Sequence, residues 1–267
     1  MKPTRRVGSH GLAVHEHPAA ADATDLPVIL IHGTMDRATS LAKVARRLPD
    51  LHVIRYDRRG YGDSLLGPGD TPVPPADTVE AQVADLLDVV DRTRCIVVGH
   101  SMGGTVALAA AARRPDLIAA VAAYESPRPW VPWWPTTSPG ARVADDAELD
   151  PATAAERFMR RMIGDAQWDR MPASSREKRR AEGPALIADM VAIRSAPAYR
   201  DADLTMPVVS ARGGESTDHH SRAAEEIAAS VPNAELWVID GACHGAHLTH
   251  PDEFAAMVRH TVALARS

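Results

Sequence analysis

The chain has 267 residues, 45% of them hydrophobic and 24% charged, a composition that is typical of a globular protein and excludes a disordered or collagen-like chain. Its 30 basic and 35 acidic side chains give a formal net charge of −5, and because the basic ones are scattered along the sequence, no nucleic-acid partner is expected. The longest apolar runs, such as residues 117–124, are far shorter than the roughly 20 residues that span a bilayer, so no membrane span is expected either.

The N-terminal residues 1–17 begin with basic side chains but contain no apolar core of a signal peptide. The sequence therefore predicts a cytoplasmic location. Only two cysteines are present, Cys95 and Cys243, so no disulfide framework is expected.

Short β-branched runs alternate with segments of helical periodicity. Helices are predicted at residues 40–48 and 77–92, the second with Asp77 as its N-cap. The predicted strands are mostly apolar on both faces, as parallel strands covered by helices are, and they comprise residues 27–31, 52–56, 94–98, 117–124, 207–212 and 235–240. This order predicts an α/β fold with a doubly wound, mostly parallel sheet.

The alternation stops after residue 124, and roughly 80 residues precede the next predicted strand. This region contains a proline- and tryptophan-rich segment, a charged stretch at 174–180 and helix candidates at 153–163 and 184–193. Because structureless loops of this length are uncommon, a helical insertion over the sheet is predicted. The expected division is a core of residues 1–126 and 203–267, with a helical cap or lid of residues 127–202.

A G-x-S-x-G motif, residues 99–103, lies between the predicted strand 94–98 and a helical segment at 105–114. In this strand–turn–helix context the motif is typical of a nucleophile elbow, and Ser101 is expected to project its hydroxyl from the carboxyl edge of the sheet. The backbone N–H of Met102, at the start of the helix, is then a candidate donor to a developing oxyanion.

A His-Gly turn, residues 32–33, directly follows the predicted strand 27–31. Taken alone, this motif is explained by an ordinary turn between a strand and a helix. Beside a serine elbow, it makes the backbone N–H of Thr34 the second candidate for the oxyanion hole.

A glycine-rich loop, residues 241–245, separates the last predicted strand from a C-terminal helix at 251–265. Its His244 can take the proton of a serine hydroxyl, because imidazole exchanges protons near neutral pH. His247 and His250 follow at three-residue steps, but no cysteine or carboxylate pattern completes a zinc site, so no metal is predicted.

These motifs, together with residues 55–64 (RYDRRGYGDS), resemble those of the α/β-hydrolase superfamily, and the resemblance covers nearly the whole chain. Residues 57–64 are similar to the D-x-R-G-x-G-x-S turn of that family, which is structural. The resemblance implies an α/β-hydrolase fold in which Ser101 is the nucleophile, His244 the base and the insertion a cap. It implies no metal and no organic cofactor.

The triad acid departs from the common pattern of the family. In most relatives a G-x-x-D turn follows the strand predicted here at 207–212, but the aspartate position is Ser216. A shifted turn would present Glu215 or Asp218 instead. Glu125 ends the strand that follows the serine helix, where haloalkane dehalogenases place their acid and where α/β folds assemble their sites. Glu125 is favoured, and Asp218 is the alternative.

Together these residues predict a serine hydrolase that cleaves a carboxylic ester or a similar acyl bond of a small-molecule substrate through an acyl-enzyme. Serine rather than aspartate at position 101 argues against dehalogenase and epoxide-hydrolase chemistry. A cofactor-free peroxidase or carbon–carbon bond hydrolase on the same fold is an alternative, and a non-catalytic ligand-binding protein is another. No oligomeric state is predicted.

Three tryptophans, Trp130, Trp133 and Trp134, lie in the proline-rich segment 127–135. Their indoles could line an apolar substrate pocket under the cap, or they could anchor the cap on the core. Both alternatives stay open at the level of the sequence.

Overall fold

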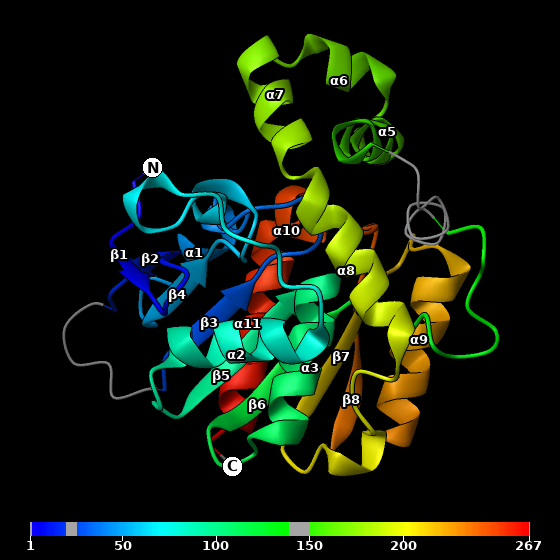
Figure 1. Cartoon of the computed structure of the whole chain (residues 1–267). Helices are drawn as coiled ribbons and strands as arrows, with labels where there is room; N and C mark the ends of the chain where they lie inside the picture. Colours follow the sequence, from blue (N-terminus) through cyan, green and yellow to red (C-terminus); the bar gives the residue numbers. More distant parts are fainter. Residues whose placement is uncertain (1, 20–25, 139–149, 267) are drawn as a thin grey trace.

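The computed structural model describes residues 2–19, 26–138 and 150–266 and contains an eight-stranded sheet of order β1-β2-β4-β3-β5-β6-β7-β8 (Figure 1). β1 and β2 are antiparallel to each other, and β2 is antiparallel to β4, whereas the other neighbouring strands are parallel. The strands are β1 (Arg5–Val7), β2 (Leu12–His17), β3 (Val28–Ile31), β4 (Val53–Tyr56), β5 (Cys95–His100), β6 (Ile118–Tyr124), β7 (Val208–Gly213) and β8 (Ala234–Ile239). The six parallel strands confirm the predicted ones.

The sequence analysis missed the β1–β2 hairpin at the edge of the sheet. β1 has only three residues, RRV, and β2 ends in the polar sequence HEH. Neither segment has the continuous apolar run that identified the other strands. Edge strands of this kind are defined by backbone pairing, here the register of Val14 with Tyr56, rather than by their own hydrophobicity.

Helices cover both faces of the sheet and create two apolar cores. Successive residues of β3 alternate between them: Ile29 and Ile31 belong to one core, and Val28 and Leu30 belong to the other. The first core lies under α2 (Val79–Val90), α3 (Met102–Arg113) and α9 (Asp218–Ser230), and the second lies under α1 (Ala42–Ala45) and α11 (Pro251–Leu264). The sheet is therefore doubly wound, as predicted.

The predicted N-cap of α2 is wrong by one residue. The N-cap is Thr78, which has extended backbone angles and whose hydroxyl accepts a 3.1 Å hydrogen bond from the N–H of Ala81. Asp77 lies one position too early to reach that amide.

Among the described residues, four α-helices lie between β6 and β7, in the region predicted to be an insertion. Figure 1 shows α5, α6 and α7 standing beyond the sheet, and α8 running back alongside it. Trp168 is fully buried among them, and its Nε1 donates a 3.1 Å hydrogen bond to Glu156. The helices are α5 (Pro151–Ile163), α6 (Asp165–Arg170), α7 (Ala173–Ala181) and α8 (Gly183–Ser195). The helix candidates correspond to α5 and α8, and the charged stretch lies in α7, whereas the exact core–cap boundaries stay a prediction.

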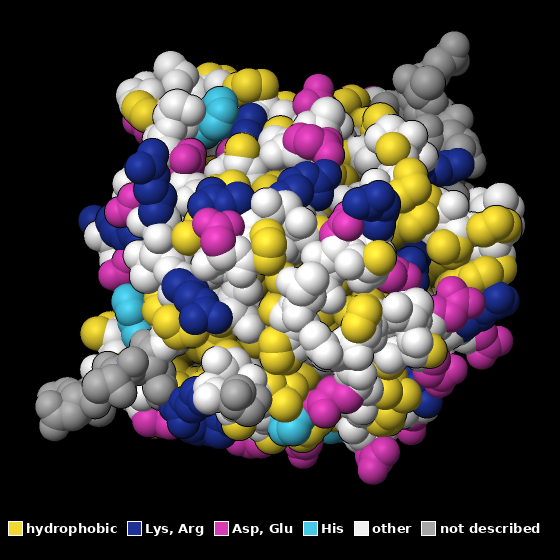
Figure 2. All heavy atoms as spheres, turned by 90° about the horizontal axis from the view of Figure 1, so that it is seen from below, with side chains coloured by type: hydrophobic (Ala, Val, Ile, Leu, Met, Phe, Trp, Pro, Cys, Tyr) yellow, Lys and Arg dark blue, Asp and Glu magenta, His cyan; other side chains and the backbone are white. Residues whose placement is uncertain are grey.

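The surface opposite these helices carries mixed charges. Figure 2 shows Lys and Arg side chains interspersed with Asp and Glu on that face, without a separate basic stripe. Within the described ranges, every helix is too short or too polar to cross a bilayer.

Candidate active site

Ser101 lies at the turn between β5 and α3, with φ 53° and ψ −124°. A non-glycine residue in such a conformation is strained by about 1–3 kcal/mol, and strain of this kind is concentrated at active sites. The turn also requires two glycines. An added Cβ at Gly99 would lie 2.2 Å from the carbonyl oxygen of Gly103, and one at Gly103 would lie 2.3 Å from that of Ile31. The tight turn leaves the Ser101 side chain partly exposed at the carboxyl end of β5.

Glu125 and His244 meet from two different loops. Glu125 directly follows β6 and is completely buried, and His244 lies between β8 and the short helix α10 (Ala246–Thr249). His244 Nδ1 and Glu125 Oε2 are 2.6 Å apart. Burial acts to raise the pKa of Glu125, but the hydrogen bond and charge of His244 lower it to about 2. An ionised Glu125 therefore accepts from Nδ1 of His244 and leaves Nε2 for proton transfer.

The other oxygen of Glu125 is held by the loop after β7. Glu125 Oε1 accepts hydrogen bonds from the hydroxyl of Ser216 and, at 3.2 Å, from the N–H of Gly213. Ser216 was noticed in the sequence only as a departure from the family pattern, and its contact with Glu125 was missed. Asp218, the alternative acid, is exposed in the first turn of α9, and in the described part of the chain it forms no hydrogen bond or ion pair with His244.

The two candidate oxyanion donors lie on the segments beside Ser101. Met102 is the first residue of α3, and Thr34 follows Gly33, where an added Cβ would lie 3.0 Å from the Cβ of Ser101. The absence of a side chain at Gly33 thus lets this turn approach the elbow. Neither the Thr34 nor the Met102 N–H donates to an acceptor among the described residues. Both amides are therefore available to a substrate oxygen.

Comparison with known proteins agrees with this architecture. Residues 28–257 match the model of a family described as the alpha/beta hydrolase family. The chain belongs to the alpha/beta hydrolase family. It is 27% identical over 263 residues to the sn-1-specific diacylglycerol lipase ABHD11 of Mus musculus, a match that covers 87% of this chain and 80% of the relative. It is 25% identical over 267 residues to the esterase YbfF of Escherichia coli K12, with 93% and 97% covered. A solved thermophilic esterase from Thermogutta terrifontis has a TM-score of 0.74 at 22% identity, with 100% of this chain and 99% of that chain covered.

Further histidines surround His244 in this hydrolase, and the sequence analysis did not place them in the site. The ring of His220 lies 4.7 Å from that of His244, and burial together with the charge of His244 lowers the pKa of His220 to about 3. The Nε2 of His100 lies 2.8 Å from the carbonyl oxygen of His244. The ring of His247 lies 4.2 Å from that of His100, and its Nε2 lies 3.1 Å from Asp36. The rings of His100 and His220 therefore both pack against the ring of His244.

The three tryptophans have different surroundings. Trp130 packs edge-on against Tyr199, with 5.6 Å between the ring centroids. Trp133 donates a 3.1 Å hydrogen bond from Nε1 to Glu226 on α9. Trp134 lies edge-on to His220, at 5.5 Å, and His220 contacts His244. The Trp133 contact joins the segment 127–135 to α9, whereas the Trp130 contact lies within residues 127–202. The ring of Trp134 packs against His220, which in turn packs against His244.

Side chains that could bind a metal also occur near Ser101, but their acids are already engaged. Glu125 accepts from His244, and Asp36 accepts a 2.8 Å hydrogen bond from the hydroxyl of Ser40. These two carboxylates are engaged within the protein, whereas the Nδ1 atoms of His15, His100, His220 and His247 have no hydrogen-bond partner among the described residues. We assign no metal role to these groups. The groups whose ligand atoms lie within 4.8 Å of one another are Asp36, His100 and His247; Glu125, His220 and His244; and His15, Asp57 and Asp63.

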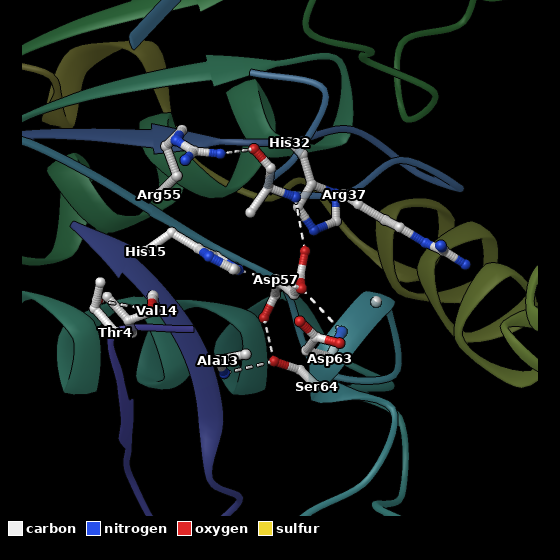
Figure 3. Close-up of polar contacts among 12 residues, drawn as sticks. Thr4, Ala13, Val14, His15, His32, Arg37, Arg55, Asp57, Asp63 and Ser64 are labelled. Carbon is white, nitrogen blue, oxygen red and sulfur yellow. Dashed lines mark hydrogen bonds and ion pairs between the residues drawn. The ribbon is translucent and has the colours of Figure 1, made fainter. Parts of the chain in front are cut away.

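Residues 57–64 form a turn stabilised by its own side chains (Figure 3). The buried carboxylate of Asp57 accepts from the N–H groups of Ala38, at 2.7 Å, and Asp63, at 2.9 Å. The Ser64 hydroxyl donates to the carbonyl oxygen of Asp57 at 2.7 Å and accepts from the N–H of Ala13 on β2 at 2.8 Å. These contacts tie the turn to the sheet and are those of a structural element, as the resemblance implied.

Proposed function

We propose that this hydrolase cleaves a carboxylic ester, or a similar acyl bond of a small molecule, with Ser101, His244 and Glu125 as its catalytic triad. The observation that carries the proposal is the 2.6 Å contact between His244 Nδ1 and the buried carboxylate of Glu125. A buried acid on Nδ1 fixes the imidazole and stabilises its protonated form, which a serine nucleophile requires. The strained elbow at Ser101 supplies the nucleophile for this base.

The proposed cycle has two halves. In the first, His244 Nε2 takes the proton of the Ser101 hydroxyl, the oxygen attacks the carbonyl carbon, and the N–H groups of Thr34 and Met102 bind the oxyanion. Collapse of this intermediate expels the alcohol, which receives the proton from His244, and leaves an acyl-Ser101. In the second half, His244 deprotonates a water that attacks the acyl carbon, and the carboxylic acid is released as Ser101 regains its proton.

The choice of an ester substrate has support outside the triad. The two full-length relatives described above are named as a lipase and an esterase. We also propose that residues 127–202 act as a cap and that Trp134, through its contact with His220, borders the substrate site. Trp133, through its hydrogen bond to Glu226 on α9, is assigned to anchoring the cap. The predicted cytoplasmic location stays a prediction.

The test is hydrolysis of p-nitrophenyl esters of increasing chain length, combined with labelling of the serine by a fluorophosphonate. We expect turnover and labelling in the wild type, and loss of both in Ser101→Ala. Ser174→Ala is a matched control, because it removes an exposed serine hydroxyl on α7 that lies outside the proposed triad. If wild-type Ser101 is not labelled and no ester is hydrolysed, the proposal fails. Binding of an ester analogue without turnover would then favour a ligand-binding protein.

A further inference from the structure

A carboxylate from helix α8 reaches into the core beneath the turn that carries Thr34. Asp189 is only 1% exposed and accepts five hydrogen bonds. Arg58 donates two of them, at 2.9 Å to Oδ1 and at 2.7 Å to Oδ2, and Gln82 donates one to Oδ1 at 2.6 Å. The hydroxyls of Thr34 and Tyr61 each donate to Oδ2 at 2.8 Å.

Arg58 holds the same turn from its other end. Its Nε donates a 3.1 Å hydrogen bond to the carbonyl oxygen of His32, and its backbone N–H donates to His32 Nε2 at 2.9 Å. His32 Nδ1 lies 2.7 Å from the carbonyl oxygen of Gly33. The turn from His32 to Thr34 is thus fixed at both ends by the Arg58–Asp189 pair. Both members of this pair are fully buried.

The stability of the fold does not explain such a pair by itself. Burying two charged side chains costs desolvation free energy, and their mutual attraction offsets this cost only when the geometry is good. Replacing such a buried ion pair by apolar side chains is often neutral for stability. Burial acts to raise the pKa of Asp189, but the charge of Arg58 and its hydrogen bonds lower it overall, so the carboxylate is ionised. An ionised acceptor with every donor in place defines positions accurately, and catalytic hydrogen-bond donors need such accuracy.

We propose that Asp189 is a positioning residue through which helix α8 holds the Thr34 turn, so that the Thr34 N–H points at the oxyanion formed on Ser101. This inference rests on the proposed acyl-transfer function. It makes oxyanion stabilisation depend on the docking of α8 onto the core. The strength of the oxyanion hole is then set in part by a helix of the inserted region, which contributes no group to the triad.

A matched pair of variants tests this inference. Thr34→Val and Tyr61→Phe each remove one hydroxyl that donates to Asp189 Oδ2 at 2.8 Å, and both leave the backbone intact. Only Thr34 belongs to the oxyanion turn. We expect Thr34→Val to lower kcat for the best p-nitrophenyl ester roughly 10- to 100-fold with little change in KM. Tyr61→Phe is expected to lower kcat by a clearly smaller factor, because it leaves the contact between Thr34 and Asp189 in place.

A second readout separates positioning from stability. A trifluoromethyl ketone adds to a serine hydroxyl and forms an oxyanion, so Thr34→Val is expected to weaken its binding by about the same factor as kcat, whereas Tyr61→Phe is expected to weaken it clearly less. Thermal unfolding of both variants, and of Asp189→Asn, measures the structural contribution separately. Should Asp189→Asn fail to fold, the matched pair still decides.

The outcomes distinguish the two proposals. Wild-type turnover with equal kcat and equal inhibitor affinity in Thr34→Val and Tyr61→Phe would overturn the positioning role and leave the acyl-transfer proposal standing. A wild type that neither hydrolyses esters nor binds the ketone would overturn the acyl-transfer function, and the positioning role with it.

Discussion

Substitution of Glu125 by glutamine tests the proposed triad at its least conventional position. The variant keeps the size of the side chain but removes the negative charge that faces His244 Nδ1 at 2.6 Å. A glutamine can also present its NH₂ group to His244, which favours the tautomer with the proton on Nε2. That tautomer cannot accept the Ser101 proton, so the base is lost although the ring stays in place.

The expected effect is large. Comparable acid-to-amide changes in serine triads lower kcat by about 10⁴-fold, which corresponds to about 5.5 kcal/mol of transition-state stabilisation. Glu125 is completely buried and bonded through both oxygens, so its charge is not screened by water. We therefore expect a loss between about 10³- and 10⁴-fold, with KM changed by less than a few-fold.

The assay is steady-state hydrolysis of the best p-nitrophenyl ester, with Asp218→Asn as the matched control. Asp218 was the alternative acid in the sequence and is exposed at the start of α9, so its variant is expected to stay within about twofold of the wild type. A large loss in Asp218→Asn with an active Glu125→Gln would refute the reasoning, because the acid would then act from the other loop.

Three further predictions concern the same site. The pKa of Glu125 is lowered from 4.5 to about 2 in the folded state, so its contribution to stability is present above about pH 4.5 and is lost as the pH falls toward 2. Between pH 5 and pH 2, the free energy of unfolding measured with urea is expected to fall by on the order of 3 kcal/mol more in the wild type than in Glu125→Gln. Equal decreases in the two proteins would contradict this prediction. Ser216→Ala removes a hydrogen bond to that carboxylate, and kcat is expected to fall about 5- to 30-fold without loss of fluorophosphonate labelling; an unchanged kcat would show that the hydroxyl is dispensable. Gly103→Ala places a Cβ 2.3 Å from a backbone oxygen and is expected to lower the free energy of unfolding by more than about 3 kcal/mol. Gly245 has a negative φ and no atom near the position of an added Cβ, so Gly245→Ala should change the free energy of unfolding by less than about 1 kcal/mol in the same denaturation assay.

The parts of the fold that sequence reasoning predicted are those with a local signal. The parallel strands carry apolar runs, and the elbow carries glycines that a tight turn requires, so both are visible in a short window of sequence. The β1–β2 hairpin has no such signal, because its strands are short, polar at the ends and defined by pairing.

The choice between two acids could not be settled by spacing, because spacing identifies the loop but not the direction of the side chain. Glu125 reaches His244 from a backbone with φ 47°, a conformation that its neighbours in β6 do not share. Asp189 was hidden for another reason: its hydrogen-bond partners Gln82 and Thr34 lie 107 and 155 residues away in the sequence. Contacts between residues so far apart in the sequence can be recognised only when the position of helix α8 against the core is known.

The contact between Ser216 and Glu125 accounts for the absence of an aspartate at position 216. Were residue 216 an aspartate, as the family pattern leads one to expect, two carboxylates would meet where Ser216 now donates to Glu125. Like charges at that distance force one of them to take up a proton, which would weaken the partner of His244. A hydroxyl donor has the opposite effect, because it favours the charged form of Glu125. The departure at position 216 therefore suits the proposed triad acid, which directly follows β6, and is no argument against the proposed triad.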